Sequence, residues 1–146
     1  MPGIIVGIDG SGHSQKALEW AMKEAALRRL PLTVLAVHEA VRGFFGGVAN
    51  YPGDPELTEK ASAAAQAETE KVLATLGDSR PESITVKAVH GIPAEELINA
   101  SKDADLVVVG SRGAGGFARL TMGSVALKVV EHALCPVTVV RPAHHD

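Results

Sequence analysis

The sequence predicts an α/β protein, with a doubly wound five-stranded parallel sheet and helices on both of its faces. Short apolar runs of the kind that form buried strands alternate with longer segments of helical spacing along the chain. Strands that alternate with helices favour a parallel sheet covered on both faces, with right-handed crossovers. The 146 residues fit a single domain, 1–146, with a core large enough to need no disulfide.

The first half of the chain is expected to supply two strands and two helices. A strand over 4–8 precedes a helix that begins at an N-cap, Ser14, and continues to about residue 29. A second strand follows over 32–38. Residues 40–54 are rich in glycine and lack any period, which predicts a long mobile loop. Asp54 and Pro55 then begin a helix that continues to about residue 76 and stops at Gly77.

The second half is expected to supply three strands and two helices. Residues 84–89 form a strand, and a short helix after Pro93 turns Ala94, Leu97 and Ile98 inward. A buried strand over 106–109, a helix over 125–134 and a strand over 136–141 complete the core. Residues 142–146 are interpreted as a short tail, so the core is 1–141.

Composition argues against several classes of function. A net charge of −3 and an aromatic content of 3% do not suit a general nucleic-acid binder. The single cysteine, Cys135, permits no internal disulfide and no thiolate zinc cluster, and we expect it to pack as a small apolar residue. The start of the chain resembles neither a signal peptide nor a membrane span. We therefore expect a soluble, cytoplasmic protein that binds no membrane.

The stretch from Gly110 to Ser124 carries most of the functional signal. It contains five glycines up to Gly123 and lies between a predicted buried strand and a predicted helix. Glycines let the backbone approach an anion, and the free N–H groups at a helix start point toward it. Ser124 is a good N-cap whose hydroxyl could equally face a phosphate. The loop predicts a phosphate cradle, with an ordinary surface turn as the alternative.

Familiar nucleotide and catalytic motifs are absent or incomplete. The loop has no G-x-x-x-x-G-K-[ST] pattern. The run from Gly113 to Ala118 matches G-x-G-x-x-A, but it follows the fourth strand rather than the first, so it is a weak dinucleotide signal. We find no nucleophile elbow, no H-E-x-x-H and no placed carboxylate pair. The sequence therefore indicates a binding site more clearly than a reaction centre, and we predict no catalytic residue.

Several residues near the predicted crevice keep two interpretations. Asp9 ends the first strand, where it can cap the following turn or meet ribose hydroxyls or a metal ion. Arg112 and Arg119 can neutralise phosphate or simply face solvent. His38 ends the second strand. It either lies close to a bound adenine or is simply a partly buried histidine at a strand end. The tail residues 144–145 could bind a metal adventitiously.

Taken together, these motifs resemble the universal stress protein family. The shared features are the Gly110-x2-Gly113-x9-Gly123-Ser124 spacing, the start at 4–11, the run 90–94 and the ending at 132–140. The resemblance covers essentially the whole chain. It implies a flavodoxin-like, Rossmann-like sheet in the order 3-2-1-4-5, with ATP between the first and fourth strands.

The resemblance also implies roles for individual residues. Asp9 would meet the ribose or an ATP-bound Mg²⁺ (or Mn²⁺), and Val37 would contact adenine. The remaining nucleotide-binding positions by motif match are Gly10, Gly110, Ser111, Arg112, Gly113, Ala114, Gly115, Gly116, Gly123, Ser124 and Val125.

The family further implies a homodimer joined through the last strand, 136–141. The sequence gives an independent reason, because an apolar strand at a sheet edge invites pairing. We expect a regulatory, ATP-binding stress-response protein with unknown protein partners. A slow ATPase or phosphotransfer enzyme that uses the same site is the alternative, and a structural dimer with a vestigial site is a third reading.

Overall fold

The computed structural model describes residues 3–9, 12–39, 55–111 and 123–141. Five strands form one parallel sheet in the order β3-β2-β1-β4-β5, which confirms the predicted topology. The strands are β1 Ile4–Ile8, β2 Leu32–Glu39, β3 Ile84–Gly91, β4 Leu106–Gly110 and β5 Val137–Val140, and the helices are α1 Gly12–Arg28, α2 Pro55–Leu73, α3 Pro93–Ser101 and α4 Ser124–His132.

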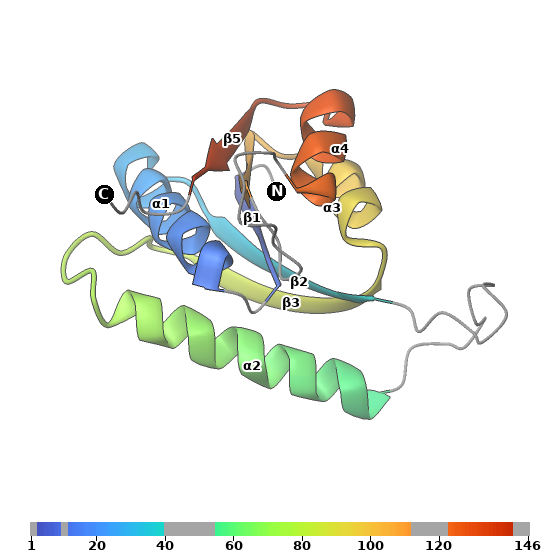
Figure 1. Cartoon of the computed structure of the whole chain (residues 1–146). Helices are drawn as coiled ribbons and strands as arrows, with labels where there is room; N and C mark the ends of the chain where they lie inside the picture. Colours follow the sequence, from blue (N-terminus) through green and yellow to red (C-terminus); the bar gives the residue numbers. More distant parts are fainter. Residues whose placement is uncertain (1–2, 10–11, 40–54, 112–122, 142–146) are drawn as a thin grey trace, which may run out of the picture.

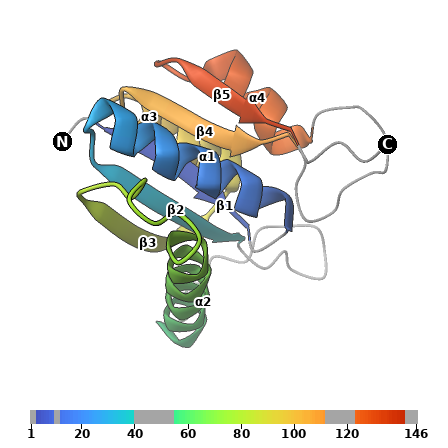
Figure 2. The same ribbon diagram turned by 90° about the vertical axis from the view of Figure 1, so that its left-hand side faces the viewer.

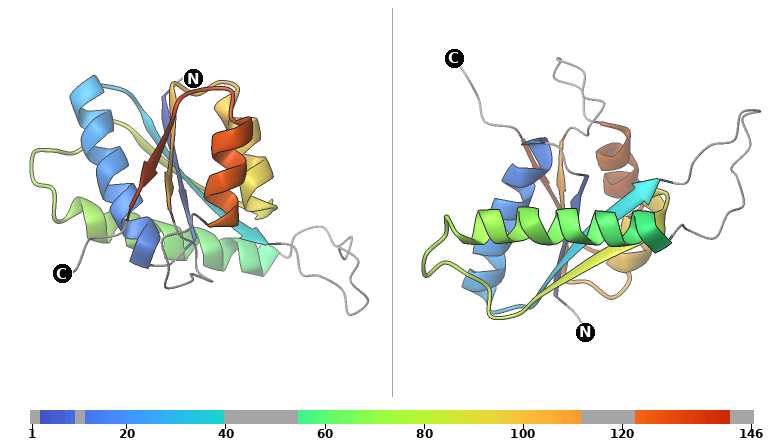
Figure 3. Two further views of the ribbon diagram at one scale, coloured as in Figure 1. Left: turned by 45° about the horizontal axis from the view of Figure 1, so that its top comes forward. Right: turned by 90° about the horizontal axis from the view of Figure 1, so that it is seen from below.

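The helices cover the sheet in two pairs (Figure 1). α1 and α2 pack on one face, where the fully buried Leu18 and Met22 meet Ile4 and Val6 of β1. α3 and α4 pack on the other face, through residues such as Leu97 and Val129. Figure 2 shows α1 lying along the sheet, and Figure 3 shows α2 crossing over β2 and β3.

The apolar patterns of the sequence explain these layers. The inner face of α1 is fully buried and consists of Ala17, Leu18, Ala21, Met22 and Ala25. Ala94 and Leu97 form the inner face of α3 as predicted. Cys135 is half-buried and packs beside the α3–α4 layer, in agreement with its predicted role. Gly77 adopts φ +55°, a left-handed conformation that favours glycine after a helix. None of the described helices is long and apolar enough to cross a membrane.

Helix starts differ from the predictions. α1 begins at Gly12, so Ser14 lies inside the first turn and is not the N-cap. α4 begins at Ser124 with Gly123 as its N-cap, so Ser124 is the first helical residue rather than the cap. α2 ends at Leu73, and the following residues continue as turns. The predicted mobile loop, 40–54, and the tail, 142–146, lie outside the described residues.

Candidate functional site

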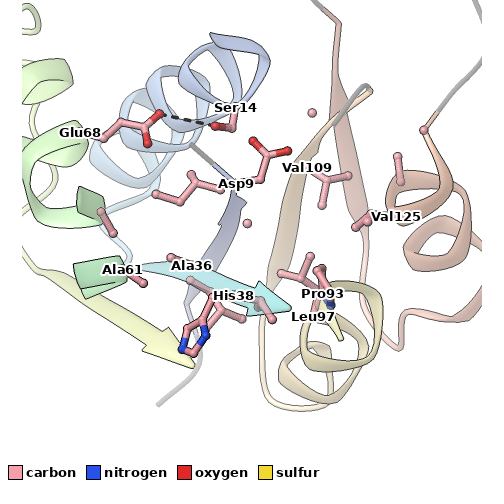
Figure 4. Close-up of a pocket in the computed structure, with 18 of the residues that line it drawn as sticks. Asp9, Ser14, Ala36, His38, Ala61, Glu68, Pro93, Leu97, Val109 and Val125 are labelled. Carbon is pink, nitrogen blue, oxygen red and sulfur yellow. Dashed lines mark hydrogen bonds between the residues drawn. The ribbon is translucent and has the colours of Figure 1, made fainter. Parts of the chain in front are cut away.

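A cavity of about 610 Å³ opens at the carboxyl ends of β1, β2 and β4 (Figure 4). Ligands of doubly wound sheets bind at this edge, where the strand order reverses. Here the reversal lies between β1 and β4, which are neighbours in the sheet. The volume falls within the range of ligand pockets, roughly 300–1,000 Å³.

Several predicted site residues come together in the lining. Asp9 follows β1, Val37 is near the end of β2, and Gly110 ends β4. The start of α4 contributes its N-cap, Gly123, and the first helical residues, Ser124 and Val125. These residues are far apart in the chain, and the parallel sheet places their strand ends at one edge.

The start of α4 is suited to an anion. Its N-cap glycine offers no side-chain hydrogen bond to the first turn. The first N–H groups of a helix have no partner within the helix, and the helix dipole adds positive potential at this end. Because Gly123, Ser124 and Val125 line the cavity, this end of the helix faces the space where a ligand would lie.

Ser111, a predicted nucleotide-binding position, lies at the end of β4 next to Gly110. It is buried, and its backbone N–H donates to the carbonyl of Val140 at 2.9 Å. Its carbonyl accepts the N–H of Gly123 at 2.7 Å. This backbone therefore ties β4 to β5 and to the start of α4. Gly10 and the loop positions Arg112, Gly113, Ala114, Gly115 and Gly116 lie outside the described residues, as does Arg119.

The second helix supplies a wall of the cavity that the sequence reasoning missed. Small side chains at Ala61, Ala64 and Ala65 line it, and Glu68 places a carboxylate beside them. Glu68 lies four and three residues beyond two of these alanines, on the same stripe as the buried Val72. A charged residue within an apolar helical stripe was the signal that could have identified it.

Glu68 and Asp9 bring two carboxyl groups to this end of the cavity, with Ser14 beside both of them (Figure 4). The buried Ser14 hydroxyl donates to Glu68 Oε1 over 3.5 Å. Burial raises the pKa of the Glu68 carboxyl, and the Asp9 charge raises it further, whereas the Ser14 hydrogen bond and Lys71 lower it. The carboxyl groups of Asp9 and Glu68 thus lie across the cavity from the N-terminal end of α4, where the helix dipole is positive.

The cavity reaches His38 at the end of β2. The Nε2 atom of His38 lies 3.0 Å from Thr58 Oγ1 of α2, and its Nδ1 lies 3.4 Å from Nδ1 of His90. Burial lowers the pKa of His38, and the adjacent His90 lowers it further. His38 therefore belongs both to the cavity and to a polar cluster that joins β2, β3 and α2.

The fold and this crevice define a doubly wound α/β protein with its ligand site at the switch point. The model of the universal stress protein family matches residues 2–141, and the chain belongs to this family. A universal stress protein of Mycolicibacterium smegmatis is 34% identical over 99% of this chain. This chain spans about half the length of the curated relatives that it matches.

Solved structures show the same fold. The universal stress protein UspA of Lactobacillus plantarum superposes with a TM-score of 0.66 at 26% identity, over 96% of this chain and 97% of that one. A universal stress protein in complex with cAMP superposes with a TM-score of 0.66 at 24% identity, over 95% of both chains. At that identity the second match is evidence of the fold alone.

Proposed function

We propose that this protein is an ATP-binding member of the universal stress protein family that acts as a regulatory nucleotide sensor. One observation carries the proposal. A single cavity joins Asp9, the end of β2 at Val37 and the uncapped start of α4. These groups suit, in turn, ribose hydroxyls, a base and phosphates.

The end of β2 gives room for a base. The pairing of β1 with β2 ends at Ile8 opposite Ala36, whereas the pairing of β2 with β3 continues to Glu39 opposite Gly91. The end of β2 therefore projects past β1 into the cavity edge. Val37 lies in this projecting part, with Leu97 of α3 also in the lining. Apolar walls with nearby peptide groups are the usual surroundings of a bound base.

The residues present fit a triphosphate and a divalent ion. The start of α4 and the loop positions 112–116 would hold the phosphates, and Asp9 would help to hold Mg²⁺ (or Mn²⁺) bound to them. When bound, the ion would neutralise phosphate charge. The universal stress protein solved with cAMP supports an adenine nucleotide as the ligand class, because it places one in a protein of this fold.

Nucleotide released from the freshly purified full chain tests the proposal. We expect mass spectrometry to find an adenine nucleotide, and we expect MgATP to raise the melting temperature of the emptied protein. Titrations with ATP, ADP, AMP and cAMP would then rank the ligands. Protein that carries no nucleotide and shows no thermal shift with any of the four would contradict the proposal.

A slow ATPase is the second candidate, favoured by the Glu68 carboxyl with its raised pKa beside the cavity. Glu68 would accept a proton from the water that attacks the γ-phosphorus, as the bond to the ADP oxygen breaks. Single-turnover hydrolysis above the buffer rate, lost in Glu68→Gln while ATP binding is retained, would favour this candidate over a sensor.

We also propose that the chain forms a homodimer through β5. This strand lies at the edge of the sheet and consists of Val137, Thr138, Val139 and Val140. On the neighbouring α4, Leu127 and Val130 are exposed, as is the following Leu134. An apolar edge strand beside apolar side chains favours pairing with a second copy. Light scattering after size exclusion should give twice the chain mass, and Thr138→Lys should shift it toward the monomer.

A further inference from the structure

His38, which lines one end of the cavity, faces a second histidine, His90, on the neighbouring strand. The parallel register of β2 and β3 places His38 directly opposite His90. Their Nδ1 atoms are 3.4 Å apart, and their rings are tilted by 54° with centroids 5.1 Å apart. Both residues belong to adjacent strands of the sheet. The arrangement of the two rings is therefore fixed by backbone pairing and does not depend on a flexible loop.

Thr58 of α2 orients one of the two rings. Its hydroxyl lies 3.0 Å from Nε2 of His38. When the hydroxyl accepts the Nε2 proton, the lone pair of His38 is on Nδ1, the atom that faces His90. A hydrogen bond from the outer ring nitrogen to a neighbouring oxygen is how most metal-binding histidines are held. His90 can likewise carry its proton on Nε2 and present its Nδ1 lone pair.

The spacing of the two nitrogens matches a shared metal ion. Two imidazole nitrogens on one tetrahedral Zn²⁺, each about 2.0–2.1 Å from it, are roughly 3.3–3.4 Å apart. The observed 3.4 Å has this value without any movement of the rings. It is also longer than a typical hydrogen bond to nitrogen or oxygen, about 2.9–3.0 Å.

We propose that His38 and His90 form a two-imidazole site for a transition-metal ion such as Zn²⁺, Ni²⁺ or Cu²⁺. Imidazole favours these ions over Mg²⁺ and Ca²⁺, which prefer oxygen. The described residues contain no group of three or more His, Cys, Asp or Glu placed to hold a metal. Solvent would fill the positions that the described residues leave open, and binding is reversible. The site is separate from an Mg²⁺ on nucleotide phosphates and does not depend on nucleotide binding.

The test uses the full chain without an affinity tag and without nucleotide. The tail histidines, His144 and His145, are replaced by glutamine so that they cannot bind the ion. We expect calorimetry with Zn²⁺ or Ni²⁺ to give one ion per chain in this background. Electron paramagnetic resonance with one equivalent of Cu²⁺ should show coupling to two imidazole nitrogens from one chain.

Matched variants separate this site from other histidines. His38→Asn and His90→Asn should each weaken binding by more than about tenfold, and Thr58→Val by about tenfold through loss of ring orientation. The control is His132→Asn, an exposed position on α4, which should leave binding unchanged. Circular dichroism checks that each variant is folded. If one variant unfolds, the Cu²⁺ spectrum of the protein with only the tail substitutions still tests the two-imidazole site.

Three results would overturn the proposal. The first is binding that disappears with the tail substitutions alone, which would place the ion on His144 and His145. The second is binding that persists in folded His38→Asn and His90→Asn. The third is no uptake of any of the three ions, which would leave the two rings joined only by a hydrogen bond.

Discussion

The two walls of the cavity are built in different ways. One wall, the motif wall, consists of Asp9, Gly110 and the start of α4 from Gly123 to Val125. It presents strand ends, glycines and helical N–H groups. The other, the α2 wall, consists of Ala61, Ala64, Ala65 and Glu68. It presents small side chains and a carboxylate from the middle of a helix. The motif wall offers backbone groups suited to an anion, whereas the α2 wall offers small side chains and one carboxylate.

The largest effect is expected on the motif wall, from Gly123→Val. Gly123 has φ −65° and ψ 159°, which valine adopts readily, so the helix should still form. The added side chain would hold phosphates away from the α4 N–H groups. Each hydrogen bond to a charged group contributes about 1.5–3 kcal/mol, so we expect ATP affinity to fall by roughly 10- to 100-fold in calorimetry.

Lys128→Val is a matched control on the exposed side of the same helix, and it should bind ATP like the parent protein. Gly123→Ala should fall between the two variants. Unchanged affinity in folded Gly123→Val would mean that the start of α4 does not hold the phosphates.

A second effect concerns the strand beneath the motif wall. A Cβ added at Gly7 of β1 would lie 2.8 Å from Leu97 Cδ1, and Leu97 is a buried residue of α3. Overpacking of this kind costs about 1–3 kcal/mol, so Gly7→Ala should lower the free energy of unfolding by that amount in urea denaturation.

Gly91→Ala offers a control with a similar clash but a softer neighbour. Its Cβ would lie 2.8 Å from Glu96 Oε1, the end of a flexible side chain that can turn away. We expect a much smaller loss of stability than for Gly7→Ala. An equally small loss for Gly7→Ala would show that the Leu97 side chain can move aside as freely as that of Glu96.

The contrast between the walls explains what the sequence could predict. Strand and helix alternation and the buried runs predicted a parallel sheet covered on both faces, because each is a local pattern with one period. The strand order 3-2-1-4-5 came from the resemblance to the universal stress protein family. Asp9 and Gly110 of the motif wall lie at strand ends, as Val37 does near the end of β2, so a parallel sheet of this fold class brings all three to one edge. Their roles in nucleotide binding remain predictions.

The α2 wall could not be predicted in the same way. Ser14 and Glu68 are 54 positions apart, and their contact depends on how α2 packs beside α1. Ser14 was predicted to be an N-cap because serine suits that role, but α1 begins two residues earlier and the hydroxyl makes a tertiary hydrogen bond. The pairing of His38 with His90 likewise required the register of β2 with β3.

The smallest effect is expected on the α2 wall, from Glu68→Gln. Glutamine keeps an oxygen that can accept the Ser14 hydroxyl, but it removes the charge beside Asp9. The pKa of Glu68 is raised in the folded protein, so folding favours the protonated carboxyl. The stabilisation from the protonated Glu68 carboxyl is present at low pH. It is lost as the pH rises through the pKa of Glu68 in the unfolded state and then through its higher pKa in the folded state. At pH 7 the ionised carboxylate is therefore mildly destabilising.

Thermal melts of Glu68→Gln and the parent protein at several pH values test whether the ionised Glu68 carboxylate destabilises the fold. We expect the variant to melt higher at pH 7 by no more than about 2–4 °C, the shift that roughly 1 kcal/mol produces in a chain of this size. The difference should shrink as the pH falls and the parent carboxyl takes up its proton. Glu70→Gln, an exposed position on the same helix, should show no such pH-dependent gain. A variant that melts lower at pH 7 would mean that the Glu68 charge stabilises the α2 wall, through Lys71 or Ser14, more than burial and Asp9 oppose it.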